Sequence, residues 1–448
     1  MIPALNASKI YSTLGNNNSL VPLAIKDIAN SMGLTAGSYI TGDTLEGKDR
    51  FIDEFGTQAI WLFGIPAYKK ILDLTLYKAL NIDPKFDVRN LSKDRVKILE
   101  KSIEYADNSI KDSIVKAAKN PKFSKNLALT KFAVSTLLTI ATYTGLTKYR
   151  HKQTKKAAEK EILAEMRKDK VDFKSYAKPE QKTAFAGVQG KNVSFTGGFQ
   201  DFMFNPVKNL MILDGAITAE RLAHSRNKQD FIGYTIKEGT FWAFMYFASK
   251  PIQKFLEKSV ENNKNNPASI DLDARVIESK ELGEAFSSGD MMKSVNKVLK
   301  LETAEEVLDF IHNNPDDFTV KMAKKSDIIP TVNKSVLGYV YERSDKIDYR
   351  QFIDFDEVKD VAKKLQKLNN KYEEFKAINV GNSSIDTFLT NVKKLKRNAV
   401  LKNMGACVGV LGIIAPAIMV LLRKMDKENS GFQVKEDLKK EMAFKGQL

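Results

Sequence analysis

Four charged residues are the side chains in this sequence whose placement suggests chemistry. Asp53 and Glu54, and further along Lys237 and Glu238, stand just before two short apolar runs that hold the only tryptophans. If these runs enter lipid, charges at their mouth are costly unless they are paired or face water, as in ion and solute pathways. We therefore treat the four as candidate polar membrane-mouth residues. The alternative is that they are ordinary surface charges at a membrane interface.

Other motifs that carry chemistry are missing from the sequence. Residues 187–192, GVQGKN, contain a Gly-Lys pair but neither the spacing nor the hydroxyl of a phosphate-binding loop. The histidines, His151, His224 and His312, stand apart from one another and from Cys407, so no Cys/His metal spacing exists. A Gly-x-Ser-x-Gly motif is also missing. The sequence thus predicts no catalytic residue, cofactor or metal, which weighs against an enzyme.

The apolar runs around the tryptophans both stop on lysine. Residues 57–71 read TQAIWLFGIPAYKKI, and residues 240–252 read TFWAFMYFASKPI. Both runs are too short to cross a bilayer, whereas tryptophan and lysine settle at the membrane–water interface. We expect each run to form a helix that dips into the interface or packs against a span, with a short tilted crossing as the alternative. The expected interface anchors are Trp61, Lys69, Trp242 and Lys250.

Residues 404–422, MGACVGVLGIIAPAIMVLL, form the strongest candidate span. These nineteen uncharged residues lie between Lys402 and Arg423. A helix between those two charges rises about 30 Å, which matches the hydrocarbon core of a bilayer. A wholly buried helix of a soluble core is the alternative. Because small residues let membrane helices pack closely, we expect a helix-packing face at Gly405, Gly409 and Gly412.

A second, weaker candidate span covers residues 132–147, FAVSTLLTIATYTGLT. Its sixteen residues include five threonines and are followed by a basic run. Sixteen helical residues reach only about 24 Å, but a snorkelling Lys131 extends the stretch back to Leu127. A buried or interfacial helix is the alternative.

The order of these elements repeats along the chain. Aligning the two tryptophans also aligns the lysines that end their runs, and each run is followed by an apolar stripe with helical spacing (96–110 and 358–375) and then by a candidate span. We therefore expect an all-α, membrane-inserted helical protein built from two copies of a Trp-helix, amphipathic-helix, apolar-helix module, with chance similarity as the alternative. The predicted divisions are an N-terminal segment at 1–39, a first membrane-associated repeat at 40–150, a basic and glycine-containing linker at 151–216, a second repeat at 217–424 with a polar helical insertion at about 260–345, and a charged tail at 425–448.

Two local signals fall inside the predicted insertion. Thr303-x-x-Glu306 is a capping-box pattern, which predicts that a helix begins there. Residues 335–342, SVLGYVYE, are the best strand signal and stand alone.

Composition bounds the class of protein and its partners. The chain has 448 residues, of which 43% are hydrophobic and 28% charged, and this is ordinary for a folded protein. A mean hydropathy of −0.31 leaves room for only a few segments in lipid. The net charge of +16 implies an acidic partner, and the lysines around the apolar segments favour an anionic lipid bilayer over specific nucleic acid binding. A cleavable signal peptide is not expected from the N-terminal residues, and one cysteine rules out an intramolecular disulfide.

Together these features predict an integral membrane protein, in a plasma or inner membrane, with a structural, scaffolding or interaction role. One alternative is a channel or transporter for ions or small solutes. A second alternative is a peripheral basic protein at a lipid surface. Residues 404–422 are the expected contact with a homo-oligomer partner or a partner helix. The basic residues that flank the two spans are nearly equal in number on the two sides, so they predict no orientation.

Overall fold

The computed structural model confirms that the chain is predominantly helical. It describes residues 7–15, 20–41, 44–169, 204–225, 228–335, 341–381, 383–425 and 434–444. Residues 170–203 of the predicted linker, with the GVQGKN segment inside them, lie outside the described residues. So do residues 336–340 of the strand signal and the first part of the charged tail from residue 426.

The chain divides into two compact units, each built from three separate segments. Unit 1 comprises Met1–Pro22, Leu72–Lys131 and Lys250–Met404, and unit 2 comprises Leu23–Ile71, Phe132–Ser249 and Gly405–Leu448. Both predicted repeats contribute residues to both units.

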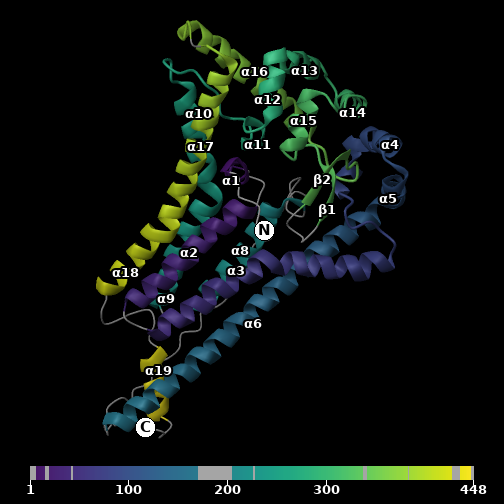
Figure 1. The fold of residues 1–448 in the computed structure, drawn as a ribbon. Helices are drawn as coiled ribbons and strands as arrows, with labels where there is room; N and C mark the ends of the chain where they lie inside the picture. The colour runs from purple at the N-terminus through teal and green to yellow at the C-terminus, as the bar shows by residue number, and fades with distance from the viewer. Residues whose placement is uncertain are drawn as a thin grey trace, which may run out of the picture. The chain divides into compact units, whose positions relative to one another are not determined.

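Unit 1 is mostly short helices around an apolar core. The capping box is confirmed, since the hydroxyl of Thr303 accepts a hydrogen bond from the Glu306 backbone N–H and a helix begins at Ala304. The elements that lie wholly in unit 1 are α1 (Ala7–Leu14), a π-helical turn (Asp73–Tyr77), two 3₁₀ turns (Val88–Leu91 and Lys93–Arg95), α4 (Val96–Tyr105), α5 (Asn108–Lys119), α11 (Ala274–Ile277), α12 (Lys280–Ser288), α13 (Asp290–Leu299), α14 (Ala304–Asn313), α15 (Phe318–Lys325), β1 (Thr331–Ser335), β2 (Tyr341–Ile347) and α16 (Phe355–Ile378) (Figure 1).

The two predicted apolar stripes have different outcomes. The stripe at 358–375 lies on α16, where its apolar side chains are buried and where α13 and α15 pack. The stripe at 96–110 does not form one helix, because the helix stops at Tyr105 and restarts after Asp107. Val96 at its start is exposed. Of the strand signal, Ser335 ends β1 while Tyr341 and Glu342 begin β2, and these two strands pair antiparallel.

Unit 2 is a bundle of longer helices, several of which begin or end in unit 1. The helix α6 (Pro121–Asp169) contains the second candidate span and continues beyond the boundary predicted at residue 150 (Figure 1). The remaining elements of unit 2 are α2 (Leu20–Ile40), α3 (Thr44–Leu72), α8 (Pro206–Ala223), α9 (Lys228–Trp242), a π-helical turn at Ala243–Phe247, a π-helical turn at Val410–Ile414, α18 (Ala415–Met425) and α19 (Val434–Phe444). Two more helices, α10 (Ser249–Glu261) and α17 (Ile385–Gly409), have most of their residues in unit 1 and reach unit 2 at one end.

The strongest candidate span is helical throughout but changes its winding once. It occupies the end of α17, the π-helical turn at Val410–Ile414 and the start of α18. Pro416 has no N–H to donate, so the carbonyl of Gly412 loses its usual partner four residues later. A π-helical turn at this place is a common local response to such a break. In the part of the chain that the structure describes, two helices, Pro121–Met166 and Ile385–Leu421, are long and apolar enough to cross a membrane.

Candidate functional site

Charged side chains gather on one face of α3, inside unit 2. Glu46, Asp49 and Asp53 are spaced by three and four residues, which places them on the same side of a helix. All three are buried, whereas Phe51 and Phe63 elsewhere on α3 are exposed. The helix therefore turns its acidic face toward the interior of unit 2 and aromatic rings outward.

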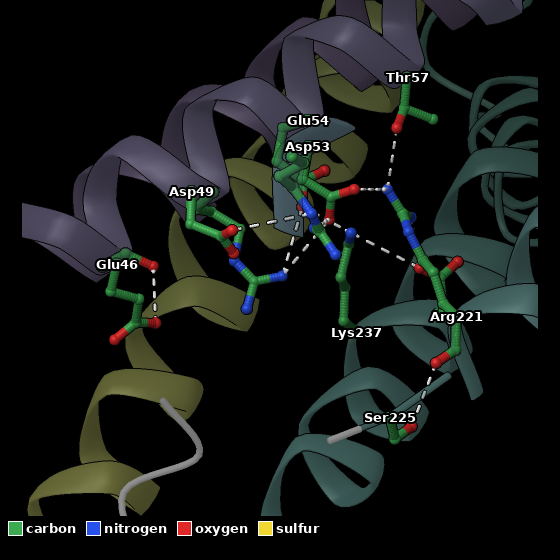
Figure 2. Close-up of polar contacts among 12 residues, drawn as sticks. Glu46, Asp49, Asp53, Glu54, Thr57, Arg221, Ser225 and Lys237 are labelled. Atoms are coloured by element: carbon green, nitrogen blue, oxygen red, sulfur yellow. Dashed lines mark hydrogen bonds and ion pairs between the residues drawn. The ribbon is translucent and has the colours of Figure 1, made fainter. Parts of the chain in front are cut away.

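Asp53 lies between two arginines from other helices. The Asp53 Oδ2 atom lies 2.8 Å from Nη1 of Arg150, on α6, and its Oδ1 atom lies 3.5 Å from Nη2 of Arg221, on α8. Figure 2 shows Arg221 reaching toward Asp53 and toward the hydroxyl of Thr57. Because these groups are buried, the attraction between opposite charges is strong and holds α3, α6 and α8 in one arrangement.

Glu54, the neighbour of Asp53 on α3, pairs with a lysine from α9. Lys237 Nζ donates a hydrogen bond of 2.6 Å to Glu54 Oε1 and lies 3.5 Å from Oε1 of Glu238 (Figure 2). Glu238 also accepts a hydrogen bond of 2.6 Å from Arg221 Nη1 and one of 3.0 Å from the Thr218 hydroxyl. Thus the structure brings together all four charged residues that stood before the tryptophan runs.

These contacts form one continuous set, which we call the buried ion network. It contains four acidic and four basic side chains, so its formal charge is zero. Every member is at most 7% exposed. Balance is expected on physical grounds, because an unpaired ion in a low-dielectric interior is strongly destabilising. The members are Asp49, Arg50, Asp53, Glu54, Arg150, Arg221, Lys237 and Glu238.

Sequence reasoning missed the arginines of this network. Arg50 stands three and four residues before the acidic pair, so its pairing with Asp53 and Glu54 was visible as a helical spacing. Arg150 belongs to a basic run and resembled an ordinary flanking charge. Arg221 lies in α8, far from Asp53 in the sequence, and only the packing of helices brings it to Asp53.

A small cavity adjoins the buried ion network within unit 2. Its volume is about 20 Å³, and α2, α3, α8 and α9 all contribute lining residues. Trp61 lies against it, is 2% exposed, and donates a hydrogen bond of 3.1 Å to Asp214 Oδ2. The hydroxyl of Tyr246 donates to the same oxygen. Trp61 is therefore an interior residue of unit 2, unlike the interfacial position expected from the sequence.

The other three expected anchors have different surroundings. Trp242 is half-buried and donates a hydrogen bond of 3.1 Å to the hydroxyl of Thr218. Lys69 is half-buried and Lys250 is exposed. Of the four, Lys250 is thus the residue whose side chain is freely available to a surface.

The three glycines of the candidate span also differ from one another. A Cβ atom at Gly33 of α2 would lie 2.2 Å from the carbonyl oxygen of Gly412, so these two backbones meet in a contact that only glycine permits. That oxygen is the one left without its helical partner by Pro416. Around Gly405 and Gly409, no atom of the described residues outside their own helix lies within 4 Å of the corresponding position. Gly412 therefore packs inside unit 2, while the other two leave an open face.

In unit 1 the His312 ring stacks on Tyr105 at 3.8 Å, and His312 Nδ1 lies 3.0 Å from the Tyr349 hydroxyl. A hydrogen bond to Asp309 raises the pKa of Tyr105 to about 12, so this phenol stays protonated near neutral pH. Within the described residues, no group of three or more His, Cys, Asp or Glu side chains could hold a metal ion.

Comparisons with protein-family models, curated proteins and solved structures found no match to this chain.

Proposed function

We propose that this chain is an integral membrane protein in which unit 2 lies within the bilayer and has a structural or scaffolding role. The observation that carries the proposal is the polarity of unit 2, which has charged side chains inside and large apolar side chains outside. Met32, Ile40, Leu137 and Ile413 are each at least 60% exposed, while the buried ion network is at most 7% exposed. Lipid favours this distribution, because charges in membrane helices face the bundle interior.

The candidate spans give independent support. In each, only 33% of the apolar window is buried within the structure. The core helix of a soluble protein would have most of such a window covered, so the exposed part calls for another apolar environment. Lipid chains supply one.

Unit 1 has the opposite distribution, and this supports a place for it in water. Its buried side chains are mainly apolar, among them Val295, Leu308 and Leu365, and its ion pairs include exposed ones such as Lys293 with Asp290. The net charge of +16 fits a protein that works next to anionic lipid. The open face at Gly405 and Gly409 is the part of the span suited to a second copy or a partner helix.

Membrane fractionation tests the proposal. The chain is expected to stay in the pellet after carbonate washing and to dissolve in detergent. Release by carbonate would instead support the peripheral, lipid-surface alternative. A variant with Leu137→Lys and Ile413→Lys places charges on the outer face and is expected to insert poorly. Lys293→Met, on the exposed surface of unit 1, serves as its control.

A second candidate function is transport of an ion or small solute. It is favoured by the cavity of about 20 Å³, because charged side chains and an interior space inside membrane helices mark transport pathways. This candidate predicts that reconstituted vesicles exchange solute and that Glu54→Gln and Glu238→Gln alter the rate. Flux equal to that of empty vesicles would count against it.

The two-copy module is also part of this proposal. Each Trp-bearing helix, α3 or α9, follows a helix that gives an aspartate to the cavity lining, Asp27 from α2 and Asp214 from α8. Each also leads into a π-helical turn. These parallels support a duplication of the helix pair and not of the later elements, since the stripe at 96–110 breaks into two helices.

A further inference from the structure

The cavity in unit 2 holds more acidic groups than the basic groups around it can balance. Glu54 and Glu238 line it, but both belong to the buried ion network, where Lys237 and Arg221 neutralise them. Two further acids line the cavity and are not members of that network. They are Asp27, from α2, and Asp214, from α8.

Neither of these two aspartates has an ion-pair partner in the described part of the chain. The contacts of Asp214 are the hydrogen bonds that its Oδ2 accepts from Trp61 and Tyr246, which are neutral donors. The buried Lys26 neighbours Asp27 in sequence, but no ion pair joins the two among the described residues. If both aspartates were ionised, the cavity would hold two negative charges that no cation compensates.

A third lining residue indicates a bound molecule. Gln58 is 6% exposed, and its Nε2 has no hydrogen-bond acceptor among the described residues. A buried amide without a partner is costly, so an acceptor is expected next to it. The cavity volume of about 20 Å³ is close to the space that one water molecule needs. A water accepts from Gln58 and can donate to a neighbouring carboxyl group.

We propose that this cavity is a proton-binding site in which Asp27 and Asp214 are protonated near neutral pH and a water held by Gln58 exchanges protons with them. In the exchange, a hydronium ion transfers one proton to a carboxylate oxygen, leaving water and a neutral carboxyl group. Protons are favoured over a metal ion, because the described residues include no group of three carboxylates, histidines or cysteines that could coordinate one. The titratable and charged groups that face the site are Asp27 and the nearby Lys26 from α2, Glu54 from α3, Asp214 and Arg221 from α8, Lys237 and Glu238 from α9, and Tyr246.

The proposal deepens the transport candidate but is tested separately from it. The measurements use the full chain purified in detergent, so they report proton binding whether or not reconstituted vesicles show flux. An absence of flux together with bound protons would remove the transport function and leave the site.

Substitution by asparagine is the first test. Asparagine has the shape and hydrogen-bonding pattern of a protonated aspartic acid, so Asp27→Asn and Asp214→Asn are expected to leave the midpoint of thermal unfolding nearly unchanged. Asp53→Asn removes a charge that two arginines need, and a drop of about 6 °C or more is expected. A drop of the same size in Asp27→Asn and Asp214→Asn would show that these aspartates are ionised and would overturn the proposal.

Infrared spectroscopy gives a second readout, which reports carboxyl protonation directly and does not rely on an unfolding transition. A carbonyl band from protonated carboxyl groups is expected near neutral pH, reduced in Asp27→Asn and in Asp214→Asn. It should persist in Asp386→Asn, which alters an exposed acid. Gln58→Leu should shift the band by removing the partner of the water. No protonated carboxyl band in the wild type, or a band that both cavity variants leave unchanged, would contradict the proposal.

Discussion

Removing the positive charge of Lys237 tests the energetic role of the buried ion network. The side chain of Lys237 is 2% exposed, and its ammonium group lies 2.6 Å from Glu54 Oε1 and 3.5 Å from Glu238 Oε1. Lys237→Met keeps most of the length of the side chain but leaves Arg50, at 3.6 Å, as the one cationic partner of Glu54 among the described residues. Breaking a buried pair in this way costs about 3–5 kcal/mol of unfolding free energy, since the remaining charge stays out of water. Glu54→Gln should cost a similar amount.

The double variant distinguishes a pair from two independent effects. Glu54→Gln combined with Lys237→Met removes both charges, so the loss should be smaller than the sum of the single losses by about 2–3 kcal/mol. Chemical unfolding in detergent, followed by circular dichroism, measures all three variants. Lys293→Met is the matched control, because its partner Asp290 lies at a similar 3.0 Å on an exposed surface. Its unfolding midpoint should not move. Additive losses, or single variants as stable as the control, would refute the reasoning.

Two further predictions concern acid stability and helix packing. Burial alone raises the pKa of Asp83, but hydrogen bonds from the backbone and from Arg350 hold this pKa below its ordinary value. The folded-state pKa therefore lies below the unfolded value of about 3.9. The stabilisation of unit 1 by Asp83 is present above that pH and is lost as pH falls through the folded-state pKa. In Asp83→Asn, the free energy of unfolding should therefore decrease less as the pH is lowered through this range. The same pH dependence in the variant and the wild type would argue against this role of Asp83. Gly33→Ala places a methyl group 2.2 Å from the Gly412 carbonyl oxygen and should lower the unfolding free energy by about 1–3 kcal/mol. Gly405→Ala, into open space, should have no such effect, and equal losses in the two variants would show that the close contact is not what matters.

Much of the fold was predictable where a short stretch of sequence carries the whole signal. The buried stripe of α16 follows from apolar residues at helical spacing, and the start of α14 follows from Thr303 and Glu306. The stripe at 96–110 failed because the spacing of apolar residues says nothing of a break at Ala106, where extended backbone ends α4. The helix α6 likewise runs past residue 150, where the first repeat was expected to end. A basic run is as good a helix former as the apolar run before it, so α6 continues.

The candidate site was predictable in its acids and not in its geometry. Asp53 and Glu54 were recognisable because charges beside an apolar run need an explanation. The partners of Asp53, Arg150 and Arg221, lie 97 and 168 positions further along the chain, and only helix packing brings them to Asp53. Trp61 was expected at an interface from its residue type, yet its N–H has a buried acceptor in Asp214. No local sequence pattern predicts such a hydrogen bond between two distant residues.

The central claim is that the outer face of unit 2 contacts lipid while unit 1 contacts water. The accessibility of introduced cysteines in open membrane fragments tests this claim most directly. Two variants, Leu137→Cys and Ile413→Cys, lie on the outer face of unit 2, where the native side chains are 64% and 69% exposed. A third, Lys293→Cys, lies in unit 1. A charged maleimide cannot react within hydrocarbon, and native Cys407 is buried. We predict rapid labelling of Lys293→Cys and labelling of the other two only after the membrane is dissolved in denaturing detergent. Equal labelling of all three in intact membrane fragments would contradict the account.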